Sequence, residues 1–285
     1  MKLRLHRSLW TNGFDLDAAI EDCRSGAFDG IEGPVPEASK TRVPFVQKLR
    51  GSGLPFIAEV VTGTGYVPSH RDVERHLEDF QRQLDAAAMT SPQFVTALVG
   101  CDAWSIFAAI DFLGHAIDAA RERLLRVSFE THRSRATFTP WTTAELVRQL
   151  PELELTCDFS HWCCVCERLV LNEEPELLKL FASRARHVHA RVGYDQGPQV
   201  PHPAAPAYRA ALEAHEQWWT EIWRAQERSG FLVTTMTPEF GPDGYLQVTP
   251  FTDAPVASLD EINHWMATRQ RERFALRAPI VSASQ

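Results

Sequence analysis

Residues 126–162, RVSFETHRSRATFTPWTTAELVRQLPELELTCDFSHW, contain the repeating unit on which the expected fold rests. Short apolar runs at 126–130 and 153–157 predict two strands, and residues 143–149 between them follow a helical period. A strand, a helix and a second strand in this order are the unit of a parallel sheet.

The same unit recurs along the whole chain. The other expected strands are residues 3–9, 28–32, 55–60, 94–99, 187–191 and 232–239. The other expected helices are residues 16–24, 45–49, 71–87, 104–123, 175–183, 208–228 and 259–273, and capping residue types mark several starts: Asp15, Ser69, Thr142 and Ser258. Because the pattern never breaks into two halves, it predicts one α/β domain, residues 1–285: a closed (β/α)8 TIM barrel with a C-terminal helical extension. A doubly wound open sheet is the structural alternative.

Composition narrows the class of protein. A net charge of −8 without a run of basic residues argues against nucleic acid as the main partner, because binding it relies on clustered Lys and Arg. The N-terminus lacks the apolar core of a signal peptide, and no stretch of about 18 apolar residues follows. We therefore expect a cytoplasmic protein without a membrane partner and with reduced cysteines. The single CxxC, Cys163 to Cys166, is interpreted as ordinary thiols.

Polar residues at the carboxyl ends of barrel strands face the active-site mouth, so the residues at the strand ends are the candidates for chemistry. They are Glu32, Glu59, Glu130 with His132, Asp158 with His161, His187 with His189, and Glu239. His187 is interpreted as a supporting or core residue, and Glu32 and Glu59 taken singly as hydrogen-bonded pocket residues. No glycine-rich nucleotide motif occurs, and residues 63–67 (GTGYV) are interpreted as a loop.

Four of these candidates stand in register on the last four strands. A carboxylate buried directly after an apolar strand needs compensation, and one shared cation compensates several. Glu130, Asp158, His189 and Glu239 are therefore predicted to hold one divalent metal ion. Three carboxylates and one imidazole suit Mn²⁺ best, with Mg²⁺, Co²⁺ or Zn²⁺ as alternatives.

Five motifs, FDGIEGP, ETHR, CDFSHW, HVHAR and TPEFGP, carry a resemblance that spans nearly the whole chain. The sequence resembles the xylose isomerase-like barrel superfamily, and within it the sugar phosphate isomerase/epimerase group that includes the ketose 3-epimerases. The resemblance implies the same four residues around one Mn²⁺ or similar ion. It also implies that His161 faces the substrate hydroxyls. The chain departs from the epimerases at Arg191, which follows His189 by only two residues.

The function implied is a metal-dependent isomerase or epimerase of carbohydrate metabolism that acts on a keto sugar or polyol derivative. Glu130 and Glu239 are the expected catalytic residues, removing and returning a proton next to a carbonyl through an enediolate. The expected substrate-binding residues are His161, His132, Arg191, Glu32, Glu59 and Trp10. No cluster of Lys and Arg marks a phosphate site, which favours a non-phosphorylated sugar.

Other interpretations stay open. The superfamily also contains hydroxypyruvate isomerase, endonuclease IV-type enzymes and lyases, so a 3-oxo-C-glycoside deglycosylase or inosose dehydratase type of lyase is the first alternative. A non-catalytic sugar-binding barrel is the second. The tryptophan-rich stretch 215–223, HEQWWTEIW, suggests a subunit contact and hence a homo-oligomer, although the same indoles could seal a helix against the barrel.

Overall fold

Eight parallel strands form a closed barrel in the computed structural model of the chain, which describes residues 1–242 and 244–277. The strands are β1 (Lys2–Ser8), β2 (Gly30–Pro34), β3 (Phe56–Val61), β4 (Val95–Leu98), β5 (Val127–Glu130), β6 (Leu155–Cys157), β7 (Ala185–His189) and β8 (Val233–Thr237). Each strand pairs with the next in sequence, and β8 pairs with β1. The predicted (β/α)8 barrel is confirmed, and the open sheet is excluded.

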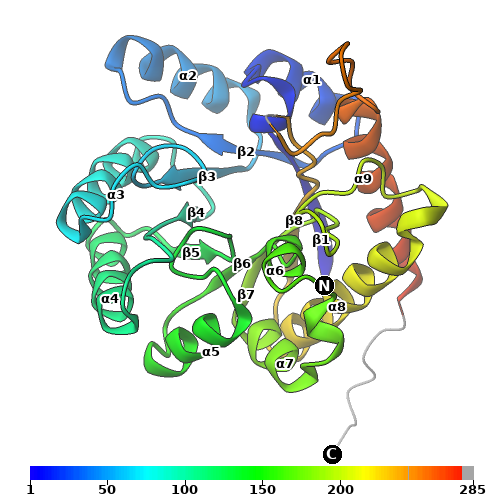
Figure 1. The fold of residues 1–285 in the computed structure, drawn as a ribbon. Coiled ribbons are helices and arrows are strands. Elements are labelled where there is room, and N and C mark those ends of the chain that lie inside the picture. Colours follow the sequence, from blue (N-terminus) through cyan, green and yellow to red (C-terminus); the bar gives the residue numbers. More distant parts are fainter. Residues whose placement is uncertain (243, 278–285) are drawn as a thin grey trace, which may run out of the picture.

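Helices surround the barrel, as Figure 1 shows. They are α1 (Leu16–Arg24), α2 (Ser39–Ser52), α3 (Val73–Ala88), α4 (Ile106–Glu122), α5 (Pro140–Gln149), α6 (Ser160–Val165), α7 (Pro175–Arg184), α8 (Arg209–Arg228) and α9 (Leu259–Leu276). The short helix α6 was not predicted, and α2 begins earlier than predicted and contains Pro44. None of the helices in the described part of the chain is long and apolar enough to cross a membrane.

The N-cap predictions are confirmed at Asp15 and Ser258 and wrong at Ser69 and Thr142. Thr139 caps α5 instead, because the helix begins at Pro140, whose fixed φ suits the first helical position. Asp72 caps α3 and accepts a hydrogen bond from the third residue beyond it.

The interior of the barrel is polar, although TIM barrels usually fill it with branched apolar side chains. Thr96 donates a hydrogen bond of 2.7 Å to Thr156, whose hydroxyl also lies 2.7 Å from that of Ser128. In another group, His187 Nδ1 lies 2.7 Å from Thr235 Oγ1. Each of these buried groups has a hydrogen-bond partner, so the barrel interior beneath the carboxyl ends of the strands contains satisfied polar groups.

The tryptophans of α8 are buried within the monomer. Trp218, Trp219 and Trp223 are at most 2% exposed, and the Trp223 ring lies 5.1 Å from that of Phe274 on α9. The interpretation of residues 215–223 as a subunit contact is therefore wrong: the indoles seal α8 against its neighbours. The homo-oligomer remains a prediction, and the stretch 215–223 no longer supports it.

Replacing Trp219 with alanine should lower the free energy of unfolding by about 3–5 kcal/mol, because it empties a large, fully buried site. The matched control is Trp141→Ala, since Trp141 is 46% exposed, and this change should cost less than about 1 kcal/mol. Urea unfolding of both variants measures the difference. Equal losses in the two variants would contradict the packing described.

Candidate functional site

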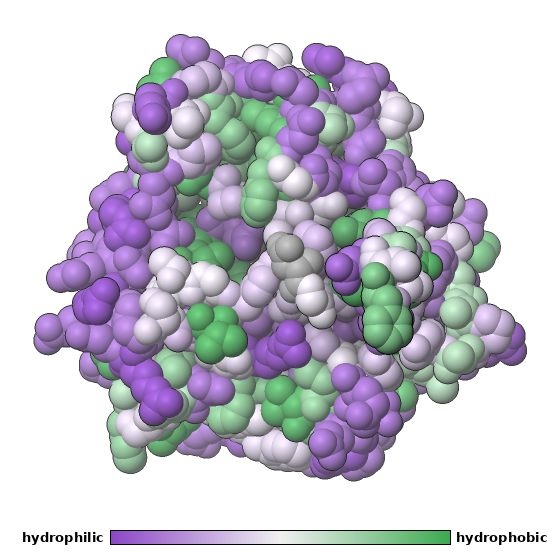
Figure 2. Space-filling model, turned by 45° about the horizontal axis from the view of Figure 1, so that its top comes forward, coloured by the Kyte–Doolittle hydropathy of each residue, from purple (hydrophilic) through white to green (hydrophobic). Residues whose placement is uncertain are grey.

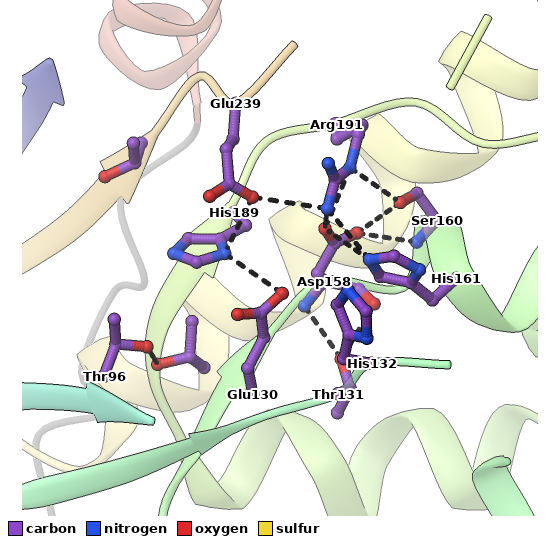
Figure 3. A network of polar contacts seen from close by, with 12 residues as sticks. Thr96, Glu130, Thr131, His132, Asp158, Ser160, His161, His189, Arg191 and Glu239 are labelled. Atoms are coloured by element: carbon purple, nitrogen blue, oxygen red, sulfur yellow. Dashed lines mark hydrogen bonds and ion pairs between the residues drawn. The ribbon is translucent and has the colours of Figure 1, made fainter. Parts of the chain in front are cut away.

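Four predicted ligands meet at the carboxyl end of the barrel. Glu130 and His189 are the last residues of β5 and β7, Asp158 directly follows β6, and Glu239 lies two residues beyond β8. One nitrogen or oxygen atom from each lies within 4.8 Å of the others, and all four side chains are buried. Figure 3 shows the Glu130 and Glu239 side chains converging on the His189 ring. Consecutive strand ends of the barrel thus bring together residues 109 positions apart along the chain, from 130 to 239.

His189 links this cluster to a carboxylate below it. Its Nε2 lies 3.0 Å from Glu32 Oε1, while its Nδ1 lies 3.0 Å from Glu239 Oε2 and 3.5 Å from Glu130 Oε1. Nε2 donates to Glu32, and in this orientation of the ring Nδ1 faces the cluster. A carboxylate behind a histidine in this way is the usual support of a metal-ligating imidazole.

Glu32 lies behind the site, although it was expected to bind substrate. It accepts hydrogen bonds from His187, His189 and Thr237, and it is not among the described residues that line the cavity. The sequence missed this because Glu32 falls in the middle of β2 rather than at its end. Glu32 is placed to orient His189, and His187 contacts Glu32 from the same side.

Asp158 is held from two sides. Its Oδ1 accepts hydrogen bonds from the backbone N–H of Ser160, at 3.0 Å, and from the Ser160 hydroxyl. Its Oδ2 accepts from Arg191 through Nε, at 3.1 Å, and through Nη2. The same Nη2 lies 3.3 Å from Glu239 Oε2, as Figure 3 shows. Arg191 therefore bridges two members of the cluster.

The His132 and His161 rings lie next to each other, with centroids 3.8 Å apart and planes tilted by 45°. His132 Nε2 lies 3.3 Å from the Tyr245 hydroxyl, and His161 Nε2 accepts a hydrogen bond of 2.9 Å from Arg191. Burial lowers the pKa of both imidazoles, and neighbouring cations lower it further. Both rings are therefore neutral, and His161 is placed to act on the cavity through Arg191.

The residues present fit a divalent cation. In the described part of the chain, Glu130 Oε2, Glu239 Oε2 and His189 Nδ1 are buried atoms without a hydrogen bond. His189 Nδ1 and Glu239 Oε2 lie 3.0 Å apart as an ion pair, and a cation between the three atoms would satisfy all of them. Both oxygens of Asp158, in contrast, already accept hydrogen bonds. Three carboxylates and an imidazole are the donors that Mn²⁺, Mg²⁺ and Zn²⁺ use.

Charges in the cluster depend on one another. Burial raises the pKa of Glu130 to about 7 against the opposing effect of His189. Burial alone would also raise the pKa of Glu32, but His187 and His189 outweigh it and hold that pKa well below its usual range. The pKa of His189 is raised well above 6.5, since Glu239, Glu32 and Glu130 outweigh its burial. Without a metal, a proton on His189 compensates these carboxylates.

A cavity of about 360 Å³ opens onto the cluster. Its walls are Trp10, Phe14, Pro34, Glu59, Val61, Gly65, Tyr66, Leu98, Glu130, His132, Arg191, Glu239 and Tyr245. The side formed by β1 to β4 is apolar apart from Glu59, and the side formed by β5 to β8 carries Glu130, Arg191 and Glu239. Figure 2 shows hydrophobic residues around a hollow in this face, within a largely hydrophilic surface.

The cavity places the remaining predicted residues and adds two others. Trp10, Glu59, His132 and Arg191 line it as expected for residues that meet a substrate. Trp10, Tyr66 and Tyr245 form a triangle of rings with centroids 5.3–5.7 Å apart, and neither tyrosine was predicted to belong to the site. Both tyrosines lie in loops that follow strands. An aromatic residue at such a position is the feature of the sequence that could have identified them as site residues.

No family model and no curated protein matches the chain. Solved structures match it over nearly its full length. D-Psicose 3-epimerase with D-tagatose from Clostridium cellulolyticum is 13% identical, with a TM-score of 0.61 over 98% of this chain and 100% of that one. Endonuclease IV from Thermus thermophilus is 13% identical, with a TM-score of 0.59 over 98% and 100%. The IolI protein with a binding zinc atom is 16% identical, with a TM-score of 0.58 over 97% and 97%.

At these identities the likeness shows the fold alone. Fold and cluster together define a barrel with a candidate metal centre at its mouth. The likeness confirms the closed (β/α)8 barrel that the sequence predicts.

Glu59→Gln should change how the stability of the metal-free protein depends on pH. Burial and the carboxylates of Glu239, Glu32 and Glu130 raise the pKa of Glu59 from 4.5 to about 8. As pH rises from 4.5 to 8, the unfolded chain loses this proton before the folded one, so Glu59 lowers stability increasingly. The variant should therefore gain about 1–3 kcal/mol at pH 8 and nothing near pH 4.

Chemical denaturation in EDTA buffer measures this gain. The control is Glu78→Gln on the exposed face of α3, which should follow the wild-type pH profile. A gain in Glu59→Gln that is equally large at pH 4 and pH 8 would contradict the assignment.

Proposed function

We propose that the chain is a metal-dependent isomerase or epimerase that acts on a keto sugar or polyol derivative. The observation that carries the proposal is the placement of Glu130 and Glu239. Both line the cavity, both have a buried oxygen without a hydrogen bond in the described structure, and His189 lies between them. Two carboxylates on one small cavity are what removal and return of a carbon-bound proton require.

Glu130, Asp158, His189 and Glu239 would hold the metal ion. Such an ion supplies positive charge that stabilises an enediolate oxygen formed next to a carbonyl. Mn²⁺ is the first choice for this mainly oxygen donor set, with Mg²⁺, Co²⁺ or Zn²⁺ as alternatives. The similarity to IolI, whose structure contains zinc, supports a divalent ion without selecting the metal.

Glu130 and Glu239 are the proposed proton-transfer groups, one removing the proton next to the carbonyl and the other returning it. A carboxylate that also binds a cation is a weaker base, but each has two oxygens, and one oxygen can face the substrate while the other binds. In the metal-free protein burial raises the pKa of Glu130 to about 7, so this carboxyl can both hold and release a proton near neutral pH.

Other residues of the cavity bind and orient the substrate. His132, Arg191 and Glu59 line it and are placed to bond sugar hydroxyls or a developing oxyanion. Trp10 offers an apolar face against which the carbon side of a sugar ring can pack. His161 lies behind Arg191 and supports it.

Two rival functions use the same site. A lyase would form the same enolate and then expel a hydroxyl group or an aglycone, so its products alone distinguish it from an isomerase. A sugar-binding barrel would need neither the metal nor the paired carboxylates. A cytoplasmic location, the absence of a nucleic-acid partner and a homo-oligomeric state are further proposals that rest on the sequence.

Glu130→Gln and Glu239→Gln should each lower turnover by about 10²–10⁴-fold while leaving the fold intact, because each removes one proton-transfer group. The measurement is incorporation of solvent deuterium into ketoses and 3-oxo glycosides supplied with Mn²⁺, followed by NMR. The control is Glu176→Gln on α7, a side chain far more exposed than the cluster, which should exchange like the wild type.

The products decide between the rivals. Deuterated starting sugar and its epimer or isomer support the proposal, whereas loss of water or of an aglycone identifies the lyase. Wild-type exchange in both variants would contradict the two-carboxylate model.

A further inference from the structure

Arg191 places a permanent positive charge inside the cluster that is proposed to bind the metal. Its guanidinium donates to Asp158 through Nε and Nη2, and Nη2 lies 3.3 Å from Glu239. Two of the four proposed ligands are thus already paired with a cation that belongs to the chain. The guanidinium stays charged at every pH at which a protein folds.

The surroundings fix this guanidinium in place. It is 2% exposed, it lies 4.7 Å from the Tyr245 ring centroid and 5.7 Å from that of Trp10, and it donates to His161. Aromatic faces on one side and carboxylates on the other both favour a cation here. The arrangement is a built ion pair and not a chance surface contact.

A divalent ion and this guanidinium would be stabilised by the same carboxylates, those of Asp158 and Glu239. Asp158 Oδ1 accepts from Ser160 and Oδ2 from Arg191, so a cation at Asp158 must share an oxygen with one of these donors. Like charges a few ångströms apart in a buried site repel each other strongly. Arg191 therefore opposes the metal while stabilising the carboxylates without it.

We infer that Arg191 is an internal counter-ion that sets the metal affinity of the site, holding Asp158 and Glu239 together in the metal-free protein and weakening the binding of a divalent ion. The inference rests on the proposed function, since it concerns the same four ligands. Arg191 acts here as a positioning residue, through the two carboxylates it contacts.

Linkage makes the inference measurable. If Arg191 stabilises the metal-free state more than the metal-bound state, its removal must lower the stability of the former more, and the metal must then bind more tightly by the same factor. A purely structural arginine would lower both stabilities equally and leave the affinity unchanged.

The experiment titrates MnCl2 into the metal-free wild type, Arg191→Met, Arg191→Lys and Arg133→Met by calorimetry, with thermal melts in EDTA and in saturating Mn²⁺. Methionine keeps much of the side-chain volume without the charge, and lysine keeps the charge without the two-pronged contact. Arg133 is the matched control, since its guanidinium also lies over the Tyr245 ring, 5.1 Å from the centroid, but it has no ion pair with the four ligands in the described structure.

We expect Arg191→Met to bind Mn²⁺ at least tenfold more tightly than the wild type, Arg191→Lys to fall between them, and Arg133→Met to match the wild type. The Tm of Arg191→Met should fall by several degrees in EDTA and recover in Mn²⁺. If Arg191→Met does not fold in EDTA, the intermediate affinity of Arg191→Lys carries the test.

The outcomes separate the two proposals. Wild-type binding of Mn²⁺ with no gain in either Arg191 variant overturns the inference and leaves the proposed function standing. Binding in Arg191→Met alone supports the inference and removes the metal-dependent function of the native chain. No binding in any variant at millimolar Mn²⁺ overturns both.

Discussion

Compensation of buried negative charge is the constraint on which this structure depends. Glu32, Glu130, Asp158 and Glu239 lie together at one end of the barrel, each at most 7% exposed. His189 forms ion pairs with three of them, through Nε2 with Glu32 and through Nδ1 with Glu130 and Glu239. Arg191 forms ion pairs with Asp158 and Glu239. Removing one partner of such a buried pair typically costs about 3–5 kcal/mol, because the other charge is left without a counter-ion.

The barrel supplies the geometry that this compensation needs. Parallel strands in sequential order bring the ends of β5, β6, β7 and β8 side by side, so residues distant in sequence converge. Buried hydroxyl and imidazole groups, including those of Thr156 and His187, lie in the strands below them. The residues at the ends of β1 to β4 form the opposite wall, which is apolar apart from Glu59, so one cavity offers a charged side for chemistry and a mainly apolar side for packing.

The sequence predicts the parts of this arrangement that follow from strand periodicity. Glu130, Asp158, His189 and Glu239 each stand at or just beyond the end of an apolar run, so counting strands was enough to group them. The sequence did not predict that Glu32 lies behind the site. Its position depends on its contacts with His187 and His189 of β7, and these contacts do not follow from its place in β2 alone.

The loop residues of the site were not predicted from the sequence for a different reason. Tyr66 and Tyr245 reach the cavity through loop conformations that no short-range rule specifies. The burial of Trp218 and its neighbours likewise depends on how α8 lies on the barrel, which the helical period leaves open.

We propose that four side chains at the barrel mouth form one metal centre. Crystals of the protein grown with Mn²⁺ test this through the anomalous difference map at a wavelength near the manganese edge. We expect one strong peak within coordination distance of Glu130, Asp158, His189 Nδ1 and Glu239, with the Glu32 contact to His189 Nε2 retained. A map without a peak there, or with a peak only at surface carboxylates, would show that these side chains do not form a metal centre.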